Sequence, residues 1–233
     1  MTSELSSLLN QDAVRRFFDS TSSTYDERRF GFLQCRREAL IKERIVGGQT
    51  LDIGCNCGAL MRRYGQGLRC IGIDLSFACL ARANNLRASQ RHSFVQTAAS
   101  HLPFKDAAFD TVVCSETLYY LDSPTSCLLE AQRTLRPGGT IIVISSNPLF
   151  YRLGRTIGVW MRLTPRDINP RPHSAHELVS LLTESGFSTI EVLHYDPIPM
   201  RGFGFLNRVP LLRKLGFLII VVGRKDSEEV RPC

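Results

Sequence analysis

Residues 51–58 read LDIGCNCG, and this short stretch has the pattern of a strand, a glycine-containing turn and the start of a helix. The apolar residues at its start predict a buried strand, and the segment from Gly54 to Gly58 predicts a tight turn that leads into a helix. Glycine lets the backbone approach a ligand closely, and the first turn of a helix offers N–H groups that lack partners. The spacing differs from the Gly-x-Gly-x-x-Gly of dinucleotide sites, which disfavours a dehydrogenase.

Outward from this turn, predicted strands and helices alternate along the chain. We expect helices at 11–19, 32–45, 58–63, 76–88 and 124–135, and another that starts with the capping box Ser174-x-x-Glu177. We expect strands at 50–53, 69–74, 94–96, 110–115, 140–145, 188–195 and 217–222, with a turn at 136–139. This order predicts an α/β fold, a doubly wound Rossmann-like sheet that is mostly parallel and ends in a C-terminal antiparallel strand pair.

The length of 233 residues suits one domain and is short for two. We divide it into a helical cover (1–45), a core that binds the cofactor (46–146) and a part with insertions on the substrate side (147–233). No apolar run approaches the roughly 20 residues of a membrane-spanning helix, and the N-terminus does not resemble a signal peptide. The eight cysteines fall largely inside predicted strands and helices, which favours a reduced, cytoplasmic protein and no metal site.

The formal net charge of +7 favours attraction to an anionic partner. Nucleic acid, a membrane surface and an acidic substrate all fit this charge, and so does a basic surface without a specific partner. The charge alone does not choose among them.

Asp74 ends the strand that follows the glycine turn. In doubly wound folds an acid at this place hydrogen-bonds the hydroxyls of a ribose that lies beside the first turn. The alternative is that Asp74 belongs to an exposed helix cap, because Ser76 follows it. The glycine turn favours the ribose role.

Four segments together resemble the class I S-adenosylmethionine-dependent methyltransferases. They are LDIGCNCG (51–58), GIDLS (72–76), LPFKDAAFDTVVCSETLYYL (102–121) and LRPGGTIIVI (135–144). The resemblance covers roughly residues 17–146 and is greatest to the branch with the methyltransferase type 11 domain, which includes the ubiquinone and menaquinone biosynthesis methyltransferases. It implies S-adenosylmethionine as the cofactor.

The resemblance also implies roles for individual positions. The residues that match the turn around the amino-acid part of the cofactor are Asp52, Gly54, Cys55 and Gly58. Those that match other parts of the cofactor site are Asp74 on the ribose, Leu75, Ala98 and Ala99 beside the adenine, Ser115 facing the methionine portion, and Tyr25 in the covering segment.

Two positions depart from the family pattern. Asn56 stands where the family usually has the middle glycine of the turn, and asparagine tolerates a positive φ better than most residues. Ala98 stands where many members have an aspartate that accepts a hydrogen bond from the adenine amino group. We still expect a functional cofactor site that includes Asn56.

A general base would assist methylation of a hydroxyl or of an acidic carbon, and histidine is the usual choice. His173 and His176 flank the start of the capped helix, and each is also explained as a surface or capping residue. Tyr119 and Tyr120 follow the strand at 110–115, and we expect one to line the pocket and the other to be core. Our candidate catalytic residues are His173 and Tyr120.

Two segments, 147–166 and 197–214, mix apolar residues with arginines. In 147–166 the apolar residues recur at intervals of three and four, which is typical of an amphipathic helix. Such a helix could cover a hydrophobic substrate, make a peripheral membrane contact, or pack on the core with a solvated basic face.

The sequence therefore predicts methylation of oxygen or carbon on a hydrophobic small molecule such as a quinone, isoprenoid, polyketide or lipid-like compound. Methylation of RNA is the alternative within the same class, although no additional RNA-binding module is visible. A catalytically inactive domain that binds a partner is a further alternative. No specific nucleic-acid partner is expected, and the sequence assigns no oligomeric state.

Overall fold

The sheet at the centre of the fold has the strand order β3-β2-β1-β4-β5-β7-β6. The computed structural model describes residues 11–24, 31–152, 168, 170–195 and 216–227. Its strands are β1 (Gln49–Ile53), β2 (Arg69–Asp74), β3 (His92–Gln96), β4 (Phe109–Ser115), β5 (Leu135–Ser146), β6 (Phe187–Tyr195) and β7 (Leu218–Lys225). Neighbouring strands from β3 to β5 pair in parallel, whereas β7 is antiparallel to both β5 and β6. The predicted fold class is confirmed.

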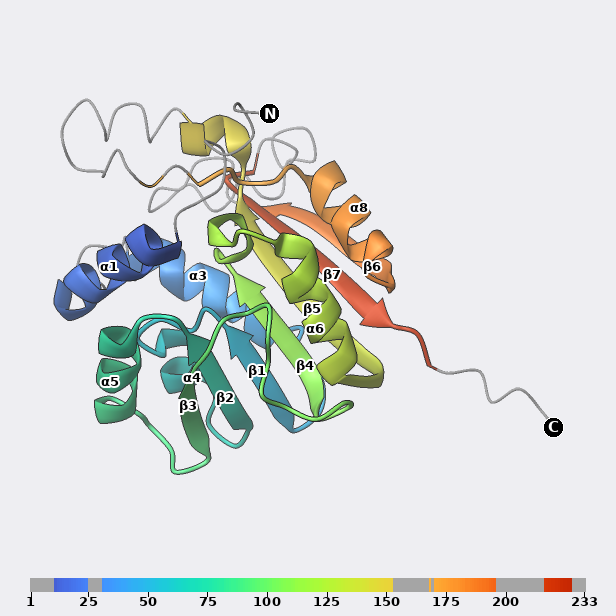
Figure 1. Ribbon diagram of the computed structural model, residues 1–233. Helices are drawn as coiled ribbons and strands as arrows, with labels where there is room; N and C mark the ends of the chain where they lie inside the picture. The colour runs from blue at the N-terminus through green and yellow to red at the C-terminus, as the bar shows by residue number, and fades with distance from the viewer. Residues whose placement is uncertain (1–10, 25–30, 153–167, 169, 196–215, 228–233) are drawn as a thin grey trace.

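Helices cover both faces of the sheet, as Figure 1 shows. They are α1 (Gln11–Thr21), α3 (Gly31–Lys42), α4 (Ala59–Tyr64), α5 (Phe77–Asn85), α6 (Pro124–Thr134) and α8 (Ala175–Glu184), with short 3₁₀ turns η1 (Ser22–Thr24) and η2 (Leu118–Tyr120). On the front face α6 and α8 pack on the sheet through Leu128 and Leu182. On the rear face α3 packs through Leu40 and Ile41. The apolar strands are buried on both sides, which explains their continuous hydrophobic runs.

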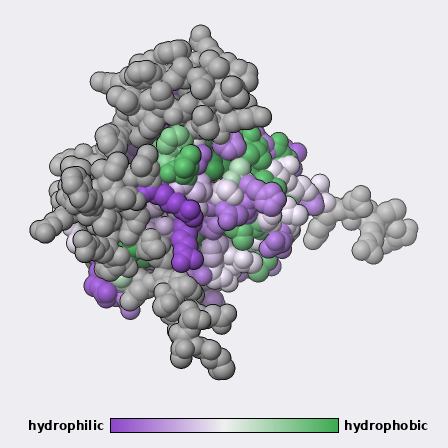
Figure 2. All heavy atoms as spheres, turned by 90° about the horizontal axis from the view of Figure 1, so that it is seen from above, coloured by the Kyte–Doolittle hydropathy of each residue, from purple (hydrophilic) through white to green (hydrophobic). Residues whose placement is uncertain are grey.

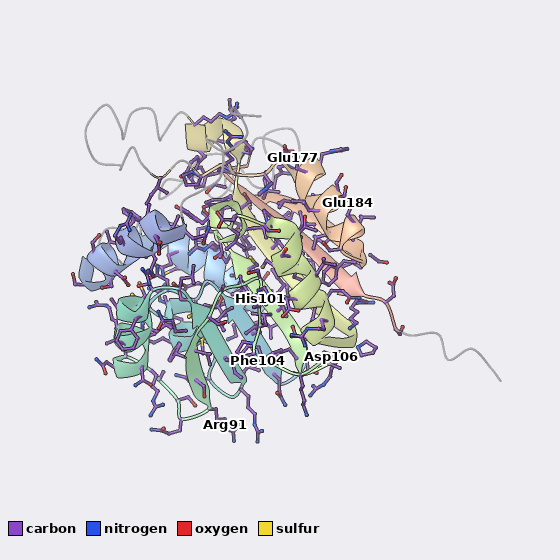
Figure 3. All side chains as sticks on the ribbon, in the orientation of Figure 1. Arg91, His101, Phe104, Asp106, Glu177 and Glu184 are labelled. Carbon is purple, nitrogen blue, oxygen red and sulfur yellow. The ribbon has the colours of Figure 1, made fainter. Side chains whose placement is uncertain are left out.

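The start of α8 was predicted correctly from the sequence, because it depends on two residues that lie three positions apart. The Ser174 side chain accepts a hydrogen bond from the backbone N–H of Glu177, and the Glu177 side chain accepts one from the backbone N–H of Ser174. This reciprocal capping box satisfies two N–H groups that would otherwise lack partners. Figure 3 labels Glu177 at the beginning of α8 and Glu184 at its end.

One expected turn is wrong. Residues 136–139 lie inside β5, which runs without a break from Leu135 to Ser146. Leu135 pairs with Phe109 and Thr140 pairs with Thr111, so the register shifts between them and the extra residues bulge out of the strand. Gly138 adopts a φ of 77° within this bulge. Pro and Gly signalled the irregularity, but the tertiary pairing on either side keeps the strand continuous.

Parts of the two predicted insertions lie outside the described residues. Residues 148–152 are helical, as the amphipathic pattern predicted, but 153–167 and 196–215 are not described. Tyr25 also lies outside the described residues. Among the helices that are described, none combines the length and the apolar character needed to cross a bilayer.

Two side chains of α6 hold the connection between β3 and β4. Glu130 accepts a hydrogen bond of 2.8 Å from the backbone N–H of Leu102, and Arg133 makes several further contacts. Its guanidinium donates to the carbonyl oxygens of Leu102 and Phe104 at 3.0 and 2.8 Å. It also donates to the carboxylates of Asp106 and Glu130 at 2.7 and 2.8 Å. Figure 3 labels Phe104 and Asp106 on this connection, which runs in front of the sheet. The connection begins directly after β3, so Arg133 fixes the segment that borders the cavity described below.

Replacing Arg133 by lysine should lower the free energy of unfolding by about 1–3 kcal/mol, because an ammonium group cannot reproduce this planar set of donors. The measurement is urea unfolding followed by circular dichroism. Arg91→Lys is the matched control, because Arg91 is exposed and its guanidinium makes one hydrogen bond of 3.5 Å, to Gly67, among the described residues. Equal stability of the two variants would contradict the role of Arg133.

Candidate active site

A cavity of about 320 Å³ lies where β1, β2 and β4 end. Figure 2 looks onto the molecule from above, and hydrophilic and hydrophobic residues lie next to one another in the described part of this face. The carboxyl ends of parallel strands are where open α/β sheets bind ligands. The cavity is lined by the turns after these three strands, by the start of the β3–β4 connection, and by α1 and α3.

The turn after β1 depends on three residues with positive φ. Gly54, Asn56 and Gly58 have φ values of 72°, 49° and 69°. The predicted positive φ of Asn56 is confirmed, and its side-chain Oδ1 accepts a hydrogen bond of 2.8 Å from the backbone N–H of Cys57. A Cβ at Gly54 would lie 2.2 Å from Thr117 Oγ1, so this glycine also allows the segment after β4 to approach. The missing family glycine is thus replaced by a residue that stabilises the turn itself.

Asp74 lies in the cavity wall and is not the cap of α5. Its two carboxylate oxygens accept hydrogen bonds of 2.9 Å each from the backbone N–H groups of Asn56 and Ser76. The helix cap is Ser76, whose side chain accepts from the backbone N–H of Cys79. Burial raises the pKa of Asp74, while the backbone hydrogen bonds from Ser76 and Asn56 oppose this rise. The carboxylate therefore connects the turn after β1 to the start of α5.

Asp52 is a buried acid with few interactions that offset the cost of burying its charge. Its exposed fraction is 4%, and no described residue donates a hydrogen bond to its carboxylate. Burial raises the pKa of Asp52 from 3.8 to about 7, the negative charge of Glu38 adds to the rise, and the positive charge of Arg37 opposes it. Glu38 is itself 2% exposed and forms an ion pair of 2.7 Å with Arg63. This end of the cavity therefore buries two carboxyl groups, and of the two only Glu38 has an ion-pair partner among the described residues.

Helix α1 bridges the cavity and is fastened at both ends. Near its start, the Gln11 side chain donates to the carbonyl oxygen of Tyr120 at 2.7 Å. Near its end, the Asp19 carboxylate accepts a hydrogen bond of 2.6 Å from the Ser76 hydroxyl. Between these points the ring of Phe18 lies edge-to-face against that of Tyr120, with 5.4 Å between centroids. Phe18 and Tyr120 both line the cavity, so α1 gives it an aromatic wall.

Most of the residues predicted from the sequence come together here. The cavity is lined by Asp52, Gly54, Cys55, Asn56, Asp74, Leu75, Ala98, Ala99, Ser115 and Tyr120. Gly58 is the N-cap of α4, next to the lining residues Cys57 and Ala59. His173 is not among the lining residues and precedes α8, so the structure does not bring it to this cavity. As expected for the tyrosine pair, Tyr120 lines the pocket and Tyr119 is core, with an exposed fraction of 3%.

Three polar residues of α3 that line the cavity were not predicted from the sequence: Gln34, Arg37 and Glu38. Gln34 and Glu38 are buried, and no local signal in the sequence indicates this. Glu116, the residue directly after β4, was not predicted either. Nothing in the local sequence indicates its positive φ of 58°.

The strand order with one reversed strand, together with a cavity built on the turn after β1, defines a class I methyltransferase fold. Residues 51–143 match a family described as "Methyltransferase domain". A ubiquinone biosynthesis O-methyltransferase from Pseudomonas aeruginosa is 30% identical over 169 residues, which cover 66% of this chain and 71% of that protein. A malonyl-[acyl-carrier protein] O-methyltransferase from Geobacter sulfurreducens is 26% identical, over 82% of this chain and 76% of that one.

The solved structure of an S-adenosylmethionine-dependent methyltransferase from Thermotoga maritima has the same fold. The two superimpose with a TM-score of 0.71 over 91% of this chain and 99% of that one, at 21% identity. The chain belongs to the S-adenosylmethionine-dependent methyltransferases, and S-adenosylmethionine is its cofactor.

The residues of the cavity fit this cofactor. Its sulfonium and ammonium groups are cationic, and the cavity holds two buried carboxylates, Asp52 and Glu38, beside it. Its carboxylate needs a donor, and the buried Nε of Arg37 has no hydrogen-bond partner. The buried carboxyl groups and the unpaired Arg37 thus each have a counterpart of opposite charge in the cofactor.

The raised pKa of Asp52 makes the ligand-free protein less stable at high pH. Between about pH 4 and pH 7 the folded chain keeps a proton on Asp52 that the unfolded chain has lost, so the free energy of unfolding falls as pH rises. Asp52→Asn should remove this decline and raise the melting temperature at pH 8, by roughly 2–4 °C per kcal/mol gained. The measurement is the melting temperature of both proteins from pH 5 to pH 8.

Asp110→Asn is the control with the opposite sign. The carboxylate of Asp110 accepts hydrogen bonds from the backbone N–H groups of Gly48 and Gln49, and from Arg136, and together these outweigh its desolvation and lower the pKa of Asp110. That variant should be less stable than the wild type at pH 8. A parallel pH dependence of the wild type and Asp52→Asn would contradict a raised pKa of Asp52.

Proposed function

We propose that this methyltransferase acts on a hydroxyl oxygen of a hydrophobic small molecule. One observation carries the proposal: the cavity joins a carboxylate-rich end, formed by Asp52, Glu38 and Asp74, to an aromatic wall formed by Phe18 and Tyr120. The first end suits a cationic cofactor and the second suits an apolar acceptor. Ligand pockets of this kind combine mostly apolar walls with a few polar groups that set orientation.

The proposed division of roles follows the charges. Asp52 and Glu38 attract the cationic groups of the cofactor, Arg37 pairs with its carboxylate, and Asp74 accepts from its ribose. Leu75, Ala98 and Ala99 pack beside the adenine. When bound, the cofactor supplies an electrophilic methyl group, which is transferred as a new bond to oxygen forms and the carbon–sulfur bond breaks.

The apolar character of the acceptor end supports a hydrophobic substrate. Val14, Phe18, Tyr120 and Leu121 line it beside the polar residues Gln11, Arg15 and Asp122, and α1 covers it. Several relatives are named O-methyltransferases, which supports methylation of oxygen. Besides the ubiquinone and malonyl-carrier enzymes, a chloroplastic tocopherol O-methyltransferase from Arabidopsis thaliana is 34% identical over 103 residues, which cover 42% of this chain and 30% of that protein.

Asp74→Ala should weaken binding of S-adenosylmethionine and of S-adenosylhomocysteine by roughly 10- to 150-fold, the equivalent of about 1.5–3 kcal/mol for a hydrogen bond to a charged group. Calorimetric titration with both ligands measures it. Unchanged affinity would remove Asp74 from the site.

Substitutions of Asn56 test the turn separately from the ribose contact. Asn56→Gly should keep or improve cofactor affinity, since glycine adopts the observed φ of 49° without strain. Asn56→Val should weaken it, because a β-branched residue resists a positive φ. The same calorimetric titration measures both, and equal affinities of the glycine and valine variants would contradict the dependence of binding on this turn.

The proposed function is tested by supplying S-adenosylmethionine with an isotopically labelled methyl group to four acceptor classes. They are hydroxylated quinols, simple phenols, activated methylene compounds and bulk RNA, and mass spectrometry locates the label. We expect labelled methyl ethers from the first two classes. We expect much less label with Asp74→Ala when the cofactor concentration is well below the dissociation constant of that variant. Label on carbon or in RNA, with none on oxygen, would overturn the proposal.

A further inference from the structure

Glu116 is a buried acid in the cavity wall, and one of its two carboxylate oxygens has no hydrogen-bond donor among the described residues. It directly follows β4, its exposed fraction is 8%, and it lines the cavity between Ser115 and Thr117. One of its oxygens, Oε1, is buried and has no hydrogen-bond partner. A buried carboxylate oxygen without a donor is unfavourable, and in native proteins it calls for an explanation.

The backbone holds Glu116 in a strained conformation. Its φ of 58° lies in the left-handed region, which a glutamate rarely adopts. The backbone N–H of Glu116 donates to the carbonyl oxygen of Ile144 in β5 at 2.8 Å, which fixes this geometry. Strain of this kind persists where the surrounding structure imposes it, and it is concentrated at functional sites.

Two hydroxyl groups hold the other oxygen of Glu116. Oε2 accepts hydrogen bonds from the phenol of Tyr119 and, at 2.7 Å, from the hydroxyl of Ser146 at the end of β5. Among the described residues no lysine, arginine or histidine forms an ion pair with Glu116. The carboxylate is thus oriented by neutral donors on Oε2, while Oε1 is left without a donor from the described part of the ligand-free protein.

Glu116 also lies next to the turn after β1. The side chain of Thr117 occupies the space that a Cβ at Gly54 would need, so the segments after β1 and β4 are in contact. Tyr120, four residues after Glu116, forms part of the aromatic wall. Glu116 therefore lies near the junction of the carboxylate-rich end and the aromatic end of the cavity.

We propose that Glu116 is a catalytic residue that takes the proton from the hydroxyl of a phenolic substrate through Oε1. This inference rests on the proposed oxygen methylation. The proton moves from the phenol to Oε1, the phenol oxygen keeps the electron pair for its new bond to carbon, and the proton passes to solvent after the ether has left. The hydroxyl becomes far more acidic as its oxygen bonds to carbon, so a carboxylate is basic enough to accept the proton at that stage.

A phenol fits this site better than an aliphatic alcohol does. Phenols lose their proton near pH 10, as tyrosine does, which is within reach of assistance by a carboxylate. An aromatic ring also suits a wall made by Phe18 and Tyr120, whose rings already pack edge-to-face. In this arrangement Tyr119 and Ser146 are positioning residues, because they act through Glu116.

The test uses the full chain and two acceptors that differ in acidity, catechol and 4-nitrocatechol. At pH 8 catechol keeps its proton, whereas 4-nitrocatechol is largely ionised and needs no base. Glu116→Gln should lower the rate with catechol by about 100-fold or more but lower that with 4-nitrocatechol by only a few-fold. Equal losses with both acceptors would mean that Glu116 has a structural role and would overturn the proposal.

A binding measurement gives a second readout that does not depend on turnover. The absorbance of 4-nitrocatechol reports its ionisation when it binds to the complex of the protein with S-adenosylhomocysteine. A negative Glu116 beside the hydroxyl should raise the pH at which the bound probe ionises, and Glu116→Gln should abolish this shift. The same ionisation in both proteins would overturn contact between Glu116 and the hydroxyl.

Glu177→Gln is the matched control, because it makes the same chemical change in the capping box of α8, and Glu177 does not line the cavity. It should affect stability but neither the ratio of the two rates nor the absorbance of the probe. A wild-type protein that methylates aliphatic alcohols but neither binds nor methylates catechols or other phenols would overturn the assignment to phenols. Failure of the proposed function would differ, because no hydroxylated acceptor would then be methylated.

Discussion

The turn between β1 and α4 is the constraint on which the site depends. Three of its five residues adopt positive φ, so the chain reverses within a few residues and the N-terminal end of α4 borders the cavity. The same reversal places the backbone N–H of Asn56 against Asp74 and leaves space beside Gly54 for Thr117. A side chain at Gly54 would therefore disturb the segment after β4 as well as the turn.

The charges buried in the ligand-free site lower the stability of the folded protein. Asp52 and Glu38 are both buried and their like charges oppose each other. Arg63 pairs with Glu38, and Arg37 offsets part of the repulsion at Asp52. Such an arrangement is unfavourable until a cation enters. A cationic ligand that binds the folded protein reduces this repulsion and raises the free energy of unfolding. Functional sites commonly lower the stability of the free protein in this way.

The sequence predicted those parts of the fold and site that depend on local signals. The turn around Asn56, the position of Asp74 and the capping box at Ser174 all follow from residue types a few positions apart. The burial of Glu38 depends instead on how α3 packs on the rear face of the sheet, and that packing leaves no local signal. The bulge at 136–139 was mistaken for a turn for the same reason, because only the pairing of β5 with β4 shows that the strand continues.

The position of β7 has a consequence for the order in which the protein can fold. Among the strands that the structure describes it is the last along the chain, yet it lies between β5 and β6, which share no hydrogen bonds with each other. During synthesis from the N-terminus, β6 leaves the ribosome before β7, its partner in the described sheet. β6 can therefore join the sheet only after Leu218–Lys225 has been synthesised, whereas β1 to β5 can pair earlier. Non-local pairing of this kind slows folding and leaves strand edges open to other chains in the meantime.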